Sequence, residues 1–249
     1  MKSNDTGLSL RALAIIAHKF RTSLSIINGY SEAVLVQADK DKFSPFTAKA
    51  LDEINVQGRH LAELVRKLSA FNKVMESSPK SLEKKAIGLK ELLKDCASQA
   101  VLQEKNESGL ETNDAAKTMV KRGTFIDIDC PANLSLNANE EMVRLSIEEL
   151  LSNAIKFNNK MEKNIKVQAA NHGDSVSISV RDYGVGVRPQ DVNRIFEPFF
   201  QVDDDFTGQI SGLGLGLPMV QRIAQLHGGS ASVVSDRGLG SIFTIKFTR

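Results

Sequence analysis

Three segments in the C-terminal half of the chain carry side chains suited to hold a nucleotide. In the first, EELLSNAIKFNN (148–159), Glu149, Asn153 and Lys156 recur at helical spacing. Residues three and four apart share one face of a helix, so a carboxylate, an amide oxygen and an ammonium line one wall. This wall suits a magnesium polyphosphate, with Asn153 as the metal ligand.

The second segment, RDYGVGV (181–187), places Asp182 at the end of an alternating strand. Its carboxylate can accept a hydrogen bond from an exocyclic amine. Gly184 and Gly186 lack Cβ atoms and so let the backbone approach a ligand closely. The segment therefore predicts a contact with a nucleobase.

The third segment, SGLGLGLPMVQRIAQLHGG (211–229), puts Gly212, Gly214 and Gly216 directly before an amphipathic helix. Backbone N–H groups and the dipole at the start of a helix favour an anion, which predicts a phosphate cradle. A Rossmann site would need its glycines early in a βαβ unit, with an acidic residue ~20 residues on. A P-loop is excluded because the chain has no GxxxxGK[ST] motif.

In this order, the three segments resemble the nucleotide site of the histidine kinase and GHKL ATPase superfamily. RIFEPFF (194–200) is similar to the family's phenylalanine box, and residues 201–211 correspond to its mobile ATP lid. The resemblance implies that ATP and Mg²⁺ bind in a C-terminal α/β sandwich of the GHKL (Bergerat) type. It extends the nucleotide-binding residues to Phe157, Phe199, Leu213, Leu215 and Thr244.

The N-terminal part of the chain predicts a helical hairpin. Apolar residues recur at helical spacing from Leu13 to Leu35 and again from Leu51 to Met75, on either side of a turn at 40–45. One hairpin has too little surface to bury both stripes, so we expect a homodimeric four-helix bundle. AHKFRTSLSIINGYSE (17–32) resembles the family's phosphoacceptor box. The resemblance makes His18 the phosphorylated residue and places Thr22 in the position used for phosphatase chemistry.

Two departures from the family pattern leave alternatives open. Lys19 follows His18 where the family usually has an acid, and an ammonium cannot accept the hydrogen bond that orients the imidazole. The chain could then be a nucleotide-binding dimer with weak or no autokinase activity, acting as a response-regulator phosphatase or scaffold. Glu149 stands where gyrase-type and chaperone-type ATPases carry their general base, so an ATPase that activates water through Glu149 is the third reading.

The fold class expected is α+β, with a dimerisation and phosphotransfer hairpin at 1–76, a linker at 77–85 and an ATP-binding domain at 86–249. The sequence predicts both helices and strands in the ATP-binding domain. Helices are expected at 88–105, 140–157, 189–196 and 217–226, and strands at 125–130, 134–136, 163–170, 175–182, 230–236 and 240–248. His227, at the end of the last helix, is expected to act as a C-terminal cation.

The function expected is that of a two-component sensor histidine kinase core, which transfers the γ-phosphoryl of ATP to His18 and then to an aspartate of a response regulator. With 32 basic and 30 acidic side chains, the charge balance speaks against a nucleic-acid partner. No apolar run approaches the ~18 residues of a membrane span, so we expect no membrane contact by this chain and a cytoplasmic location. Cys96 and Cys130 are isolated and expected to be reduced.

Overall fold

The computed structural model of the protein describes residues 20, 24–32, 34, 45–107, 123–202 and 213–248. His18, Lys19, Thr22 and Gly212 lie outside the described residues. The chain divides into two compact units, Met1–Glu76 and Ser77–Arg249. No helix among the described residues is long and apolar enough to cross a membrane.

The first unit is helical, as the apolar stripes predict. Residues 24–32 are helical, and α2 runs from Pro45 to Glu76. Leu24 and Val65 are buried against each other, with Ala62 and Leu68 packed beside them. Other apolar members of the two stripes remain exposed, among them Ile27, Ile54 and Leu61. Among the described residues of the first unit, the hydrophobic faces are thus only partly covered.

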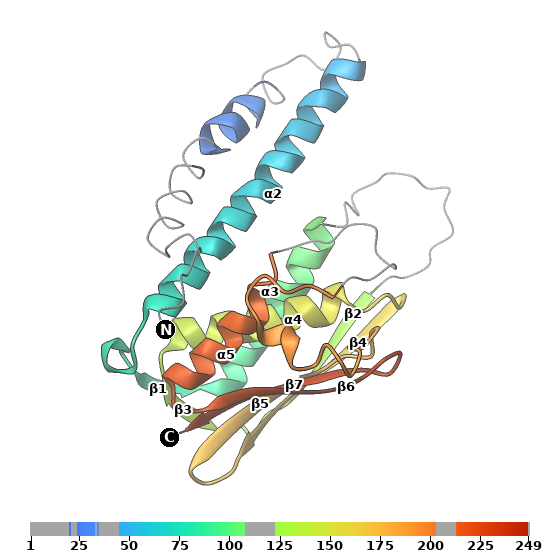
Figure 1. Ribbon diagram of the computed structural model, residues 1–249. Coiled ribbons are helices and arrows are strands. Elements are labelled where there is room, and N and C mark those ends of the chain that lie inside the picture. The colour runs from blue at the N-terminus through green and yellow to red at the C-terminus, as the bar shows by residue number, and fades with distance from the viewer. Residues whose placement is uncertain are drawn as a thin grey trace, which may run out of the picture. The chain divides into compact units, whose positions relative to one another are not determined.

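The second unit packs helices on one face of a five-stranded sheet (Figure 1). The helices are α3 (Leu89–Glu107), α4 (Glu140–Lys156) and α5 (Gly216–Leu226). The strands are β2 (Gly123–Asp129), β4 (Glu162–Asn171), β5 (Ser175–Arg181), β7 (Gly240–Thr248) and β6 (Ser230–Asp236), in this spatial order. β2 pairs parallel to β4, and the other pairs are antiparallel.

Strict alternation along β5 and β7 builds the core. Val176, Ile178 and Val180 point to the helix-covered face, and Phe243, Ile245 and Phe247 of β7 do the same. Because successive side chains of a strand alternate between faces, the residues between them lie on the open face. These are mostly hydroxyl-bearing or charged, so the sheet has one apolar and one polar side.

Two local predictions differ from the structure. Within the expected linker, Pro79–Ser81 forms a 3₁₀ turn (η2), and β1 (Lys85–Gly88) pairs with β3 (Ser135–Ala138) in a separate two-stranded sheet. β1 could not be predicted from the sequence, because a four-residue strand with a single buried side chain, Ile87, shows no alternation of polar and apolar residues. The helix expected at 189–196 is reduced to a 3₁₀ turn, η3 (Arg194–Phe196).

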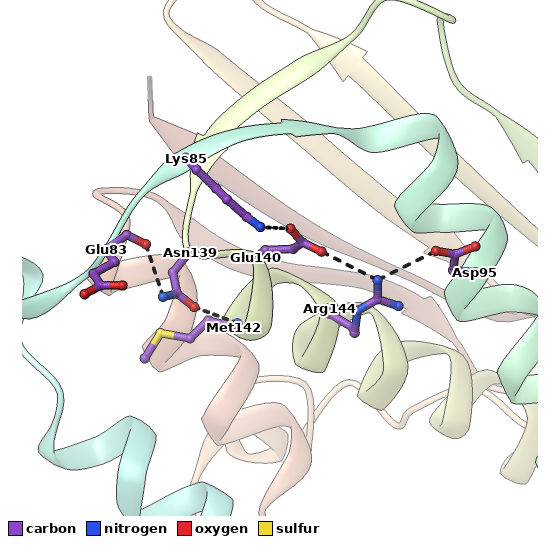
Figure 2. A network of polar contacts seen from close by, with 7 residues as sticks. All are labelled: Glu83, Lys85, Asp95, Asn139, Glu140, Met142 and Arg144. Atoms are coloured by element: carbon purple, nitrogen blue, oxygen red, sulfur yellow. Dashed lines mark hydrogen bonds and ion pairs between the residues drawn. The ribbon is translucent and has the colours of Figure 1, made fainter.

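A polar network fixes the start of α4 (Figure 2). Asn139 caps the helix, because its Oδ1 accepts from the Met142 N–H at 3.0 Å while its Nδ2 donates to the Glu83 carbonyl at 3.2 Å. Glu140 pairs with Lys85 of β1 at 2.6 Å and with Arg144, whose Nη2 lies 3.8 Å from Asp95 of α3. The hydrogen bond and charge of Lys85 lower the pKa of Glu140. These exposed pairs add little stability but orient α4 against β1 and α3.

His227 joins the end of α5 to the start of α4. Its Nδ1 lies 2.8 Å from the Ile223 carbonyl, and its Nε2 accepts from the Asn139 N–H at 3.1 Å. This pattern defines a neutral ring that is protonated on Nδ1. The side chain is 3% exposed, and burial lowers its pKa. His227 is therefore a buried neutral link, and its expected role as a cation is wrong.

Acid should weaken the second unit through His227. A lowered pKa means that the unfolded chain takes up a proton more readily, so the stabilisation is complete above the unfolded value of 6.5. It is lost as the pH falls through the lower folded pKa. His227→Phe keeps a ring but leaves the Asn139 N–H without its acceptor, at a cost of roughly 1–3 kcal/mol. Urea unfolding at several pH values measures both effects.

The matched control is His172→Phe, because His172 is exposed in the turn between β4 and β5. We expect the control to retain the pH dependence of the unfolding free energy and His227→Phe to reduce it. An unchanged slope in His227→Phe would show that another group titrates in this range.

Candidate functional site

One wall of the site is the face of α4 that carries Glu149, Asn153 and Lys156. Glu149 is 8% exposed, and its Oε2 lies 2.5 Å from where a Cβ on Gly216 would stand. The missing side chain at Gly216 thus lets the first turn of α5 approach α4. Asn153 lies one turn further along the same helix, and Lys156 is exposed at its end.

The start of α5 faces this wall. Its N-cap residue, Leu215, is buried and offers no side-chain hydrogen bond to the first turn. Leu213 is half-buried, and Gly214 adopts a φ of 66° that favours glycine. An uncapped helix start concentrates N–H donors and the positive end of the helix dipole, which is an environment for an anion.

The loop after β5 holds a buried carboxylate. Asp182 is 5% exposed, and its Oδ1 accepts from the Gly184 N–H at 2.8 Å. Burial raises the pKa of Asp182, while hydrogen bonds from the backbone of Gly184 and Ser241 act in the opposite direction. A desolvated carboxylate held by backbone donors is a fixed acceptor for a ligand that offers an N–H group.

Backbone on both sides clamps this loop. The Val185 N–H donates to the Phe157 carbonyl at the end of α4 (3.1 Å), while the Asp182 N–H donates to the Ser241 carbonyl (2.9 Å) and Gly238 donates to the Val185 carbonyl (2.8 Å). A Cβ on Gly184 would overlap the Phe157 carbonyl, and one on Gly186 would overlap the Asp236 carbonyl. Both glycines are thus required by close backbone approach within the protein itself.

A backbone hydrogen bond joins Phe199 to Gly214, which lie on the two sides of residues 203–212 in the sequence. The Phe199 N–H donates to the Gly214 carbonyl at 3.0 Å, and a Cβ on Gly214 would lie 2.6 Å from the Phe200 carbonyl. Phe199 has a φ of 65° and is 56% exposed. A non-glycine residue held in this conformation costs about 1–2 kcal/mol, and such strain concentrates at functional sites.

Aromatic rings with nearby cations lie close to the loop. The Lys156 Nζ lies 4.8 Å from the centre of the Phe157 ring, which is partly exposed. The Tyr183 ring, next to Asp182, has the Arg181 guanidinium at 4.8 Å and the Lys160 ammonium at 5.7 Å. Of these cations, the Lys160 ammonium acts on the buried Asp182 carboxylate and lowers its pKa, against the larger effect of burial.

Thr244 lies apart from the other predicted residues. It lies on the open face of the sheet, where it pairs with Ser179 and Ser232 and lines a polar hollow. Ser241 of the same strand shares the helix-covered face with Phe243, and its carbonyl accepts from the Asp182 N–H. The alternation along β7 places Ser241 and Phe243 on one face and Thr244 on the other.

The structure brings together α4 with Glu149, Asn153 and Lys156, the loop with Asp182, and the glycine-lined start of α5. Among the described ranges, no group of three or more His, Cys, Asp or Glu side chains could hold a metal ion. A divalent cation here would rely on the Asn153 oxygen and on ligand oxygens, which is how Mg²⁺ is usually bound next to phosphates.

Residues 138–249 match the model of the histidine kinase-, DNA gyrase B- and HSP90-like ATPase family. This range contains α4, the Asp182 loop and α5, so the second unit has the ATPase fold of that family. With the helical first unit before it, the chain is similar to the catalytic cores of histidine kinases.

Individual proteins show the same similarity over almost the whole chain. The Non-motile and phage-resistance protein of Caulobacter vibrioides is 28% identical over 95% of this chain and 26% of its own length. Sensor histidine kinase YkoH of Bacillus subtilis is 28% identical over 93% of this chain and 46% of its own. The crystal structure of full-length ShkA in complex with AMPPNP superposes with a TM-score of 0.73 at 25% identity, covering 96% of this chain and 46% of that one. The chain thus spans less than half of each of these proteins.

The clamp on the loop generates a prediction about Gly186. Gly186→Ala combines left-handed strain with overlap against the Asp236 carbonyl, whereas Gly173→Ala meets the same strain in open space. The control should lose about 1–2 kcal/mol of unfolding free energy. Gly186→Ala should lose roughly 1–3 kcal/mol more, because the hairpin must shift. Chemical denaturation of both variants measures the difference, and equal losses would show that the loop is not clamped.

Proposed function

We propose that the chain binds ATP, with the adenine against Asp182. The observation that carries the proposal is the buried Asp182 carboxylate, in a loop that backbone hydrogen bonds hold on both sides. The carboxylate is oriented by the Gly184 N–H at 2.8 Å and can accept from an exocyclic amine. The family match over residues 138–249 and the likeness to a structure solved with AMPPNP support this assignment.

The polyphosphate end would lie between α4 and the start of α5. Asn153 offers an amide oxygen to Mg²⁺, and Lys156 offers a positive charge to phosphate oxygens. The backbone N–H groups from Gly214 to Gly216 would cradle the phosphates. Mg²⁺ neutralises charge that develops on the transferred phosphoryl group, so the work of the protein is positioning and electrostatic stabilisation.

The phosphoryl acceptor in this proposal is His18, which is assigned from sequence alone. A lone pair on one imidazole nitrogen forms the bond to the γ-phosphorus, the bond to the bridging oxygen breaks, and ADP leaves. The other ring nitrogen loses its proton to a base, which Lys19 as an ammonium cannot be. The phosphoryl group would then pass to an aspartate of a response regulator.

The exposed apolar residues of the first unit support a second copy of the chain as a partner. Ile27, Ile54 and Leu61 continue the stripes that Leu24 and Val65 begin to bury. A four-helix bundle of two hairpins would cover them. The resemblance of residues 17–32 to the phosphoacceptor box assigns phosphatase chemistry to Thr22, and dephosphorylation of a response regulator is the alternative activity if Lys19 suppresses autophosphorylation.

Glu149 supports a second candidate function, ATP hydrolysis. The Glu149 carboxylate is buried against the first residue of α5, where the γ-phosphate end of the ligand would lie. A carboxylate there can orient a water for attack. The two activities can be distinguished by substitution. Glu149→Ala should abolish phosphate release by hydrolysis, and His18→Gln should abolish phosphoryl transfer to the protein.

Asp182→Asn should weaken nucleotide binding while preserving the shape of the site. The amide oxygen can still accept from Gly184, but the amide nitrogen presents a donor where the second carboxylate oxygen stood. Loss of a hydrogen bond to a charged group corresponds to roughly 10- to 100-fold weaker binding of adenosine and ATP by calorimetry. Because burial raises the pKa of Asp182, affinity in the parent chain should also fall in acid at a higher pH than for an ordinary Asp.

The control for this experiment is Asp174→Asn, an exposed carboxylate in the turn between β4 and β5. It should leave affinity and its pH dependence unchanged. If Asp182→Asn binds adenosine as tightly as the parent chain, Asp182 does not contact the base.

Incubation with γ-labelled ATP tests the acceptor. The chain should become labelled in an acid-labile, base-stable form, and His18→Gln should abolish the label because the nucleophile is gone. His60→Gln, at an exposed position of α2, should keep it. Phosphate release that continues in His18→Gln and stops in Glu149→Ala would instead establish hydrolysis. Label that survives in His18→Gln would overturn the assignment of His18.

A further inference from the structure

Ser235 of β6 touches the clamped loop from the side opposite α4. Its Oγ accepts from the Val187 N–H at 2.8 Å and lies 3.0 Å from the Gly240 carbonyl and 2.9 Å from the Ser241 Oγ. Val187 closes the loop that begins at Asp182. The Ser235 hydroxyl thus forms hydrogen bonds with the loop that follows β5, with the turn between β6 and β7, and with β7 itself.

Donor counting fixes the direction of these bonds. A serine hydroxyl has one proton and two acceptor lone pairs. The Gly240 carbonyl can only accept, so it takes the Ser235 proton. The Val187 N–H and the Ser241 hydroxyl then donate to the two lone pairs of Ser235. The hydroxyl is saturated, and alanine would remove three bonds at once.

The geometry of the strand pair makes this position specific. Ser235 and Ser241 are direct cross-strand partners, so their side chains lie on the same face, the one covered by the loop. Ser241 accepts the Asp182 N–H through its carbonyl at 2.9 Å. A chain of contacts therefore runs from Val187 through Ser235 and Ser241 to Asp182, from one end of the loop to the other.

We propose that Ser235 is a positioning residue for the base-binding end of the site. It holds Val187 and so sets the path of the backbone between Asp182 and Val187 relative to the Asp182 carboxylate. The inference rests on the proposed binding of adenine at Asp182. Ser235 acts through the loop, without touching the nucleotide, and its effect is confined to the end of the ligand that the loop faces.

The test compares Ser235→Ala with Ser235→Thr, which retains the hydroxyl. The alanine variant should bind adenosine, ADP and ATP more weakly by the same factor, about threefold to tenfold, as expected for neutral hydrogen bonds. Threonine should restore affinity. The matched control is Ser232→Ala on the same strand, because Ser232 is exposed on the open face. Amide exchange at Val187, measured by NMR without nucleotide, should accelerate only in Ser235→Ala.

The outcomes separate this inference from the function on which it rests. If the parent chain binds no adenosine or ATP, the proposed function fails, and this inference falls with it. If the parent chain binds them and Ser235→Ala binds equally well, only the role of Ser235 is refuted. A loss for ATP without a loss for adenosine would refute it too, because the effect would then lie at the phosphate end. So would a threonine variant that folds normally but does not recover affinity.

Discussion

The structure of the second unit depends on the close packing of the 182–187 backbone between the carbonyl groups of Phe157 and Asp236. The loop from Asp182 to Val187 runs so close to the Phe157 carbonyl on one side and to the Asp236 carbonyl on the other that only glycine fits at 184 and 186. This contact joins the end of α4, the end of β5 and the hairpin of β6 and β7 into one body. It also explains how a carboxylate can be buried at Asp182, since the fixed N–H groups around it replace water.

The two helices that border the site are held in register at their far ends. Asn139 starts α4 with a side-chain cap, and its own N–H is taken by His227 at the end of α5. At the other side, the Glu149 carboxylate rests against Gly216, where α5 begins. One part-buried hydrogen bond and one close contact therefore join α4 and α5 at these two points. Neither relies on the exposed ion pairs around Glu140.

Elements with a strong period could be predicted from the sequence, and contacts between distant residues could not. The alternation in β5 and β7 and the long apolar stripes of α2 and α4 are visible because every second or third to fourth residue is buried. β1 has no such period, and it is a strand because its backbone pairs with β3. The neutral state of His227 depends on an N–H 88 positions away in the chain. The faces of β7 could be assigned from the sequence, because Ser241 and Phe243 are two positions apart and share a face, which Thr244 does not.

Charge at the start of α5 links the architecture to the chemistry. A carboxylate at the positive end of a helix is favourable, so Glu149 stabilises α5 where it stands. A triphosphate brought to the same helix start would meet that negative charge at short range, in a region where burial weakens screening. Favourable binding would then require positive charge on the same wall, and α4 places Asn153 and Lys156 one and two turns beyond Glu149. In the proposed function, Asn153 would offer an oxygen to Mg²⁺ and Lys156 would offer a positive charge. The order of these three side chains along α4 would therefore couple nucleotide binding to the metal ion, and the position of Glu149 relative to the γ-phosphate would decide between transfer to His18 and hydrolysis.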